Sequence, residues 1–253
     1  MSTGIIIQAR LGSTRLPGKV LKEVYPGVTM LEYMVDRVKA VQHVESIIVA
    51  TTTEDGDDPI YELCLSKGIE CFRGSENNVL KRYYDCALEY GFKTVVRLTS
   101  DCPLVDPGII EKCIDMYNHG GYDYFSNTCP PALSKYPDGS DVEVFSYSSL
   151  ELAHSNASSK SDREHVTFYF WKHGNPMFKC GILESDDDYS DYRYTVDYPE
   201  DFEVIKFLAS QIRNKNISGS VSELAKILED NPGIKSMNSS YYAGIGWEKK
   251  DEK

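Results

Sequence analysis

Basic residues are fewer than acidic ones in this sequence, and long apolar runs are absent from it. Lys and Arg number 27 against 39 Asp and Glu, which gives a formal net charge of −12. An acidic chain binds polyanions poorly, so nucleic acid and anionic membranes are disfavoured as partners. No stretch approaches the roughly 20 apolar residues of a transmembrane helix, and no cationic segment precedes the short apolar run 5–7 as in a secretory signal. We therefore expect a cytoplasmic protein that binds neither nucleic acid nor membranes.

The seven cysteines lack the spacing of a metal site or a disulfide framework. Their number is odd, they are scattered, and no two of them form a Cys-x-x-Cys pair. Zinc sites and small disulfide-linked domains both require such pairing. We therefore expect reduced thiols, most of them buried among apolar neighbours.

The overall composition, with 41% hydrophobic and 26% charged residues among 253, is that of a globular protein. In the first half, short runs rich in β-branched residues alternate with segments whose apolar residues recur at helical spacing. The expected strands are 4–9, 46–53, 69–74 and 93–101, and the expected helices are 29–41, 58–68, 77–91 and 106–121. This alternation predicts right-handed crossovers and a mainly parallel sheet with helices on both faces.

The pattern changes after residue 122, where separate short strand candidates have loop-like and helical segments between them. The strand candidates cover 122–127, 141–146, 177–183 and 192–198, and the expected helices cover 146–157, 162–174, 199–212 and 220–231. We find no internal repeat and no linker that would divide the chain. The sequence thus predicts one α/β domain over residues 1–253, with an antiparallel-leaning second half.

A cationic loop follows the first expected strand, within "IIIQARLGSTRLPGKVL" (5–21). It carries Arg10, Arg15 and Lys19, and its two glycines, Gly12 and Gly18, allow tight turns and close backbone approach to an oxyanion. Loops at the carboxyl ends of parallel strands line the ligand crevice of α/β proteins. Neither a Walker P-loop nor a Rossmann pattern is present. We favour a phosphate site over a solvated basic turn, because the cations share one loop after a buried strand.

Two aspartates end apolar strand candidates that lead to the same edge of the predicted sheet. Asp101 closes "RLTSD" before Pro103, and Asp197 closes "YTVD" before a helix that starts with proline. Either one alone would be interpreted as a helix cap or turn residue. Opposite a phosphate-binding loop, the pair suits Mg²⁺, which takes one or two carboxylates from protein and the rest from phosphates and water.

Three further residues are candidates for binding an acceptor. Asp141 and Glu143 alternate on one face of the expected strand 141–146, where they could bind sugar hydroxyls or help to place a metal. An edge strand with an outward acidic face is the equal alternative. Arg163, near the start of the expected helix 162–174, is a candidate for an acidic substrate.

Taken together, these segments resemble the cytidylyltransferases that make CMP-activated sugars. The likeness is to the spore-coat-polysaccharide branch, related to CMP-Kdo and CMP-acylneuraminate synthetases, and it covers nearly the whole chain in order. The motifs are "QARLGSTRLPGKVL", "FRGSENNVLKRYY", "RLTSDCPLVDP", "PDGSDVEVFS", "DREHVT", "YTVDYPEDF" and "LEDNPGIKSMN". The resemblance implies a GT-A-like nucleotide-diphospho-sugar transferase fold, a nucleotide-binding half (1–121) and an acceptor-binding half (122–253). It also implies Mg²⁺, CTP and a sugar-acid-like acceptor as ligands, and a possible homodimer.

The resemblance also assigns site residues. It implies Arg10, Arg15 and Lys19 as the catalytic cations on the triphosphate, and Asp101 and Asp197 as the metal ligands. The nucleotide-binding set that it implies is Gln8, Ala9, Arg10, Leu11, Gly12, Ser13, Lys19, Ser75, Asn78, Arg82, Thr99 and Ser100. Two positions depart from the family pattern: Asn78 stands where aspartate is expected in "DVLxRY", and Ser100 stands where glycine commonly precedes the metal-binding aspartate.

Two other functions compete with CMP transfer. A GT-A glycosyltransferase that consumes a nucleotide sugar usually has an Asp-x-Asp metal motif, and "TSDCPL" offers a single carboxylate there. A non-catalytic nucleotide-binding homologue is the second alternative, and the presence of the predicted cations and aspartates argues against it. UDP release from a sugar nucleotide, or pyrophosphate release from CTP, would separate the first alternative from the cytidylyltransferase.

Overall fold

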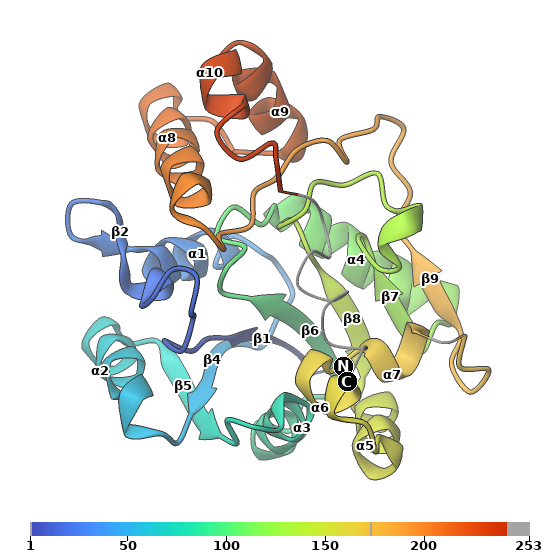
Figure 1. The fold of residues 1–253 in the computed structure, drawn as a ribbon. Helices are drawn as coiled ribbons and strands as arrows, with labels where there is room; N and C mark the ends of the chain where they lie inside the picture. The colour runs from blue at the N-terminus through green and yellow to red at the C-terminus, as the bar shows by residue number, and fades with distance from the viewer. Residues whose placement is uncertain (1, 173, 242–253) are drawn as a thin grey trace.

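The computed structural model describes residues 2–172 and 174–241, and over them the fold is built on one seven-stranded sheet (Figure 1). The strand order is β5-β4-β1-β6-β8-β7-β9. β1 pairs in parallel with β4 and β6, whereas β8 runs antiparallel to β6 and β7. The strands are β1 (Thr3–Gln8), β4 (Ser46–Thr52), β5 (Glu70–Gly74), β6 (Thr94–Thr99), β7 (Tyr124–Ser126), β8 (Glu143–Ser146) and β9 (Cys180–Ile182), and a small hairpin adds β2 (Glu23–Tyr25) and β3 (Val28–Thr29). This is the mainly parallel mixed sheet that the sequence predicts.

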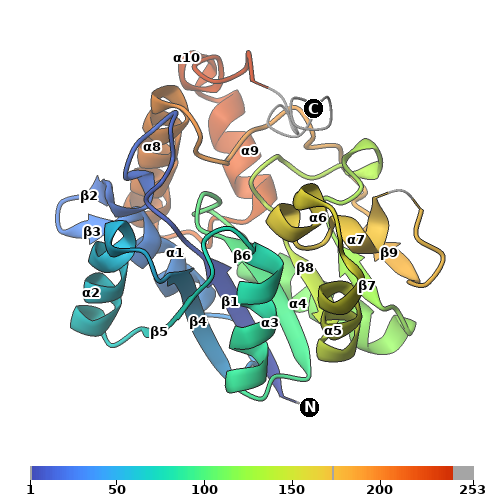
Figure 2. The same cartoon turned by 60° about the horizontal axis from the view of Figure 1, so that its bottom comes forward.

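Helices cover both faces of the sheet (Figure 2). One core cluster contains buried side chains of α1, α2, α4, α8 and α9, and a second contains those of α3 and α5. The helices are α1 (Met30–Val38), α2 (Asp58–Lys67), α3 (Val79–Glu89), α4 (Pro107–Gly120), α5 (Tyr147–Asn156), α6 (Lys160–His165), α7 (Phe168–Trp171), α8 (Pro199–Lys215), α9 (Val221–Glu229) and α10 (Pro232–Lys235). None of the helices described is long and apolar enough to cross a membrane.

The position of β1 at the centre of the sheet, covered on both faces, explains why its sequence does not alternate between polar and apolar residues. Ile5 and Ile7 belong to the first core cluster and Ile6 to the second, and all three are fully buried. Successive side chains of a strand point to opposite faces, so a strand covered on both sides must be apolar throughout. The polar residues that follow it lie at the carboxyl edge, where the parallel strands β1, β4 and β6 end side by side.

Three predictions about the second half are wrong. Residues 192–198 form no strand; their backbone makes a single bridge, between Asp138 and Arg193. The predicted helix 162–174 is two short helices, α6 and α7, separated where Val166 adopts φ 57, and residue 173 lies outside the described residues. The edge-strand interpretation of 141–146 fails because β8 lies between β6 and β7, and it begins only at Glu143.

Candidate active site at the carboxyl edge of the sheet

The loop after β1 is held in place by Asp57, a residue that the sequence analysis did not single out. The Asp57 carboxylate accepts hydrogen bonds from the Leu11 backbone N–H, at 2.6 Å, and from the Thr52 hydroxyl. The Leu11 carbonyl in turn accepts from the backbone N–H groups of Ser13 and Gly18, which closes the loop. The buried carboxylate therefore ties the cationic loop to the end of β4. The acidic run before α2 was the only signal for this residue in the sequence.

The two loop glycines differ in what they require. Gly18 has φ 65, in the left-handed region, whereas Gly12 has ordinary φ, and a Cβ at either position would meet no atom within 4 Å. We expect Gly18→Ala to lower the free energy of unfolding by about 1–2 kcal/mol and to reduce turnover, because Lys19 follows directly. Gly12→Ala should leave stability unchanged. Chemical denaturation of both variants tests this, and equal stability losses would contradict it.

Lys19 lies between the two predicted metal-binding aspartates. Its Nζ donates to Asp101 Oδ2 at 3.0 Å, to Asp197 Oδ1 at 3.1 Å and to the Val196 carbonyl at 2.6 Å. Burial lowers the pKa of Lys19, but the two carboxylates outweigh burial and raise it. Arg15 also reaches Asp197, at 2.8 Å. The structure thus brings four predicted residues together, with the two cations on the aspartates; their contact with a triphosphate stays a prediction.

A third cation, Arg193, contacts three aspartates, including the other carboxylate oxygen of Asp197. Its guanidinium donates to Asp138, to Asp197 Oδ2 at 3.3 Å and to Asp201 Oδ1 at 2.9 Å. Asp201 is fully buried and accepts from the backbone N–H groups of Asp197 and Tyr198, both at 2.9 Å. These bonds fix the segment that carries the predicted metal ligand. Asp201 lies in the first turn of α8, and the sequence analysis missed Arg193 because its partners are distant in the chain.

The site has an excess of carboxylates over cations. Asp141, which accepts from the Thr128 hydroxyl at 2.8 Å and the Gly139 N–H at 2.9 Å, completes a group of Asp101, Asp138, Asp141, Asp197 and Asp201 facing Arg15, Lys19 and Arg193. Burial and the neighbouring Asp141 raise the pKa of Asp138 to about 7. Unbalanced negative charge of this kind is relieved by a cation.

The residues present fit a hard divalent cation bound through few protein ligands. Within the described ranges, no three His, Cys, Asp or Glu side chains are grouped to hold a metal. Oxygens of Asp101 and Asp197, however, converge on one point, since both lie within 3.1 Å of the same nitrogen. Two carboxylates, with phosphates and water for the rest, are a donor set that Mg²⁺ accepts.

The Asp101–Lys19 pair predicts a specific loss of acid stability. Burial raises the pKa of Asp101, but the Lys19 ammonium more than offsets it and lowers this pKa from 3.8 to about 2. A carboxylate with a depressed folded pKa stabilises the protein above its unfolded pKa and loses that contribution as pH falls toward the folded value. We expect the stability advantage of wild type over Asp101→Asn to shrink by about 1–2 kcal/mol between pH 5 and pH 2, discounted because Asp101 is one-third exposed.

Urea titrations of both proteins in a chelating buffer would measure this difference. The chelator keeps divalent cations from replacing the ammonium as the partner of Asp101. A wild-type advantage that stays constant over the whole pH range would contradict the depressed pKa.

Arg10 and Arg82 form a second cationic group. Neither makes an ion pair with a carboxylate among the described residues, although Asp57 and Glu76 lie near enough to attract the charge of Arg82. Arg82, on α3, is 2% exposed, and its Nη1 donates to the Ser75 carbonyl at 3.0 Å. Burial lowers the pKa of Arg82, and the nearby positive charge of Arg10 lowers it further. Two arginines that repel each other beside a crevice favour an anion between them. Ser75 and Asn78 hydrogen-bond around the start of α3, so they position Arg82.

The remaining predicted site residues lie at the ends of the neighbouring strands and make hydrogen bonds within the protein. Ala9 donates from its backbone to Ala50 at 3.1 Å, the Ser100 backbone donates to the Gln8 carbonyl at 3.0 Å, and the Thr99 hydroxyl contacts the Cys102 thiol at 3.2 Å. The first bond joins the ends of β1 and β4, the second joins those of β1 and β6, and the third lies within the turn after β6. Direct contact of these residues with a nucleotide stays a prediction.

The predicted acceptor residues are dispersed. Glu143 is 2% exposed and accepts from Arg97, Tyr124 and Thr167, so its burial argues against contact with an acceptor. Arg163 is exposed on α6 and donates from Nε to the Ala157 carbonyl at 3.4 Å. Of the three predicted residues, only Asp141 joins the aspartate group.

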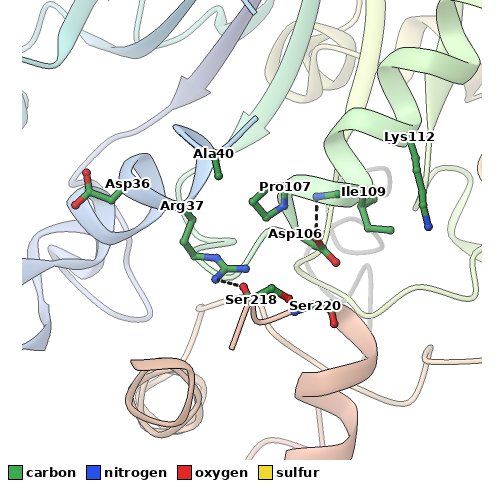
Figure 3. Close-up of a pocket in the computed structure, with 10 residues that line it drawn as sticks. Asp36, Arg37, Ala40, Asp106, Pro107, Ile109, Lys112, Ser218 and Ser220 are labelled. Atoms are coloured by element: carbon green, nitrogen blue, oxygen red, sulfur yellow. Dashed lines mark hydrogen bonds between the residues drawn. The ribbon is translucent and has the colours of Figure 1, made fainter. Parts of the chain in front are cut away.

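A cavity of about 550 Å³ lies apart from these residues, between α1, α4 and the segment before α9 (Figure 3). Arg37 spans it and donates to the carbonyls of Val105, Ser218 and Gly219. Asp106 borders it and caps two helices, through the backbone N–H groups of Gly108 and Val221. These contacts join helices on one face of the sheet, and their donors and acceptors satisfy one another.

Comparison with known proteins agrees with this arrangement. The family model for cytidylyltransferase matches residues 4–232. The spore coat polysaccharide biosynthesis protein SpsF of Bacillus subtilis (strain 168) is 33% identical over 234 residues, covering 90% of this chain and 94% of that protein. A solved cytidylyltransferase structure from Leptospira borgpetersenii serovar Hardjo-bovis (strain JB197) is 36% identical, with a TM-score of 0.83 over 93% of this chain and 97% of that chain. CMP:2-keto-3-deoxy-manno-octonic acid synthetase, solved with CTP, shares the fold at 16% identity, with a TM-score of 0.62 over 83% of this chain and 99% of that chain.

Proposed function

The chain belongs to the cytidylyltransferase family, and we propose that it transfers CMP from CTP to a small sugar acid or related acidic acceptor, with release of pyrophosphate. The observation that carries this proposal is the division of the site's cations into two groups. Arg10 is exposed and makes no ion pair with a carboxylate among the described residues, so it suits phosphate oxygens, whereas Lys19 and Arg15 lie on Asp101 and Asp197. The relatives support the substrates: SpsF takes part in polysaccharide biosynthesis, and the octonic acid synthetase was solved with CTP.

Charge neutralisation is the main chemical task in this reaction. An acceptor oxygen attacks the α-phosphorus of CTP in line, the bond to the β-phosphate oxygen breaks, and pyrophosphate leaves with the negative charge. Arg10 would bind phosphate oxygens with its planar guanidinium group, and the buried Arg82 would add positive charge nearby. Lys19 has three donors, so it can keep one carboxylate and offer another hydrogen to the leaving group. The loop that Asp57 anchors keeps these cations in one place, which lowers the cost of orienting the substrate.

A divalent cation fits the proposal at Asp101 and Asp197, with Mg²⁺ as the expected ion. When bound, it would neutralise phosphate charge and orient the triphosphate. Asp201 and Arg193 hold the backbone and carboxylate of Asp197, so this ligand is oriented beforehand. The ammonium of Lys19 lies on the facing oxygens of Asp101 and Asp197 and would have to release one of them to the cation. Asp141, the predicted acceptor residue in the aspartate group, would accept hydrogen bonds from acceptor hydroxyls. We also propose a homodimer in the cytoplasm as the working form.

A substrate screen tests the proposed function. Purified protein with Mg²⁺ is given CTP, UTP, ATP or GTP and a panel of sugar acids, and pyrophosphate is measured with a coupled assay. The expected result is pyrophosphate release that requires CTP, the metal and one of the acids. UDP release from a nucleotide sugar would instead support the glycosyltransferase. Absence of pyrophosphate with every acid, despite CTP binding, would support the non-catalytic homologue.

A further inference from the structure

The motif "LEDNPGIKSMN" (228–238) has no part in the site described so far, yet its last residue lies against the aspartate group. The chain turns after α10, and Asn238, in this turn, is 4% exposed. Its Nδ2 donates to the Arg193 carbonyl at 3.2 Å and to Asp201 Oδ1 at 3.0 Å. Both partners are acceptors, so the atom that faces them is the amide nitrogen, and both of its hydrogens are used. Asn238 therefore ties the end of the motif to residues on either side of Asp197 in the chain.

Asn238 completes the hydrogen bonds of Asp201, which is fully buried. Oδ1 of Asp201 accepts from Asn238 and from Arg193 Nε, the latter at 2.9 Å. Its Oδ2 accepts from the backbone N–H groups of Asp197 and Tyr198, both at 2.9 Å. A buried carboxylate keeps one orientation when donors hold both of its oxygens. The donors on Oδ1 thus keep Oδ2 on the backbone of Asp197, the proposed metal ligand.

Tyr241, in the same turn, contacts the ring of Tyr198. The two ring centroids are 4.0 Å apart and the ring planes differ by 7°, so the rings are stacked. The Tyr241 backbone N–H donates to the Asn238 carbonyl at 3.1 Å, which joins the two residues. The guanidinium of Arg15 lies over the same Tyr198 ring, 5.1 Å from its centroid, while it pairs with Asp197 at 2.8 Å. The stack therefore restricts the ring on which Arg15 lies.

We propose that the C-terminal turn 236–241 completes the active site, with Asn238 and Tyr241 as positioning residues for Asp197 and Arg15. The inference rests on the proposed function, in which Asp197 binds the metal and Arg15 the triphosphate. Asn238 acts through the buried carboxylate on the backbone of the metal ligand, and Tyr241 acts through the stacked ring on the guanidinium. Neither residue touches a substrate in this assignment. The motif belongs to the site because the fold brings it there, far from the other site motifs in the sequence.

The test for Asn238 is the affinity for Mn²⁺ alone, measured by electron paramagnetic resonance. Mn²⁺ accepts the same carboxylate ligands as Mg²⁺. Asn238→Ala should raise the dissociation constant about 10-fold or more, the usual effect of removing a residue that orients a metal ligand. At saturating Mg²⁺, kcat for pyrophosphate release should return to within about twofold of wild type, because the ligands themselves are intact.

Asn231→Ala is the matched control for this measurement. Asn231 lies in the same motif and donates to the Ile227 carbonyl at 2.8 Å, outside the aspartate group. Each substitution removes a hydrogen-bonded amide, so both should lower the Tm measured without metal. Only Asn238→Ala should weaken Mn²⁺ binding. Equal Mn²⁺ affinities in the two variants would make Asn238 a purely structural residue and overturn its positioning role.

The test for Tyr241 is the affinity for CTP, measured by isothermal titration calorimetry in a chelating buffer. Tyr241→Ala removes the stacked ring, so Arg15 should be held less well and the dissociation constant should rise about 2- to 10-fold. Tyr241→Phe keeps the ring and removes only the hydroxyl, which lies 3.5 Å from Glu200, and it should bind CTP as wild type does. Wild-type affinity in Tyr241→Ala, or an equal loss in both variants, would overturn the role of the stack.

Failure of the inference differs from failure of the proposed function. If wild type binds Mn²⁺ and CTP, and the variants behave as expected, but no acid gives pyrophosphate, the proposed reaction fails while the binding roles of the two residues stand. Wild type that binds no Mn²⁺ would overturn the role of Asn238. Wild type that binds no CTP without metal would overturn that of Tyr241.

Discussion

Asp101→Asn is expected to lower kcat/KM for CTP by about 10³-fold. The substitution keeps the shape of the side chain but removes the charge that faces Lys19 at 3.0 Å. It also removes one of the two carboxylates whose oxygens converge at the proposed metal position. Asp197 and the Val196 carbonyl still hold the ammonium, so the fold should persist. Pyrophosphate release at saturating Mg²⁺ measures the effect, and circular dichroism verifies the fold.

Asp106→Asn is the matched control for that measurement, since it changes the same residue type five positions further along the motif "RLTSDCPLVDP". Asp106 caps α4 and bonds the first residue of α9, outside the aspartate group. Asn has a single acceptor oxygen, so one of the two backbone N–H groups would lose its partner. The substitution should therefore cost about 1 kcal/mol of stability and leave turnover within a few-fold of wild type. If Asp101→Asn, purified free of wild-type enzyme, also retained turnover within tenfold, Asp101 would not belong to the catalytic site.

The first half of the fold could be predicted because its strands are buried on both faces. Continuous β-branched runs and helix-ending glycines are local signals, and β1, β4 and β6 follow them to within one or two residues. The segment 192–198 was wrongly predicted as a strand because its apolar residues alternate along the chain although its backbone forms no strand. Tyr194 and Val196 are buried in the core, so the apolar alternation is real, but their backbone lies at the sheet edge and pairs only through one bridge.

The break between α6 and α7 had no local signal at all. The sequence "DREHVTFYFW" has good helical spacing, yet Val166 leaves helical geometry and Thr167 bonds Glu143, which is distant in the chain. Tertiary contacts of this kind override local propensity. The helix prediction therefore failed at Val166 and Thr167, where the chain turns so that Thr167 can contact Glu143, the buried partner of Arg97.

The residues of the candidate site are of two kinds. Some have a local signal in the sequence, and others are identified only by contacts with residues distant in the chain. Lys19, Asp101 and Asp197 could be proposed from position, because each follows an apolar run that leads to the sheet edge. Arg193 and Asp57 could not, since what makes them important is a partner supplied by the fold: Asp138 for one, and the Leu11 backbone for the other. A residue that anchors a loop has no motif of its own, and only the folded chain identifies it.

Lys19→Met is expected to have the second large effect, on turnover and on stability together. Lys19 is 8% exposed and makes three bonds, so its removal leaves Asp101 without a cation and Asp197 with Arg15 and Arg193 alone. Breaking a buried ion pair from one side costs about 3–5 kcal/mol; because Asp101 is one-third exposed and Asp197 keeps two cations, we expect about 2 kcal/mol. Turnover should fall by about 10²-fold or more. Chemical denaturation in a chelating buffer and pyrophosphate release measure the two effects.

The same variant separates two uses of the aspartate pair. The ammonium in wild type holds the oxygens that a divalent cation would bind, so wild type must give up hydrogen bonds before Mg²⁺ alone can bind. Lys19→Met has no such competitor, and Mg²⁺ without nucleotide should raise its Tm more than that of wild type, since a ligand stabilises the state that binds it more tightly. Lys39→Met is the control, because Lys39 makes an exposed pair with Asp36 at 2.8 Å, worth at most about 0.5 kcal/mol. An equal Mg²⁺ shift in Lys19→Met and wild type would show that the metal does not share Asp101 and Asp197 with Lys19, and the proposed metal position would then have to be abandoned.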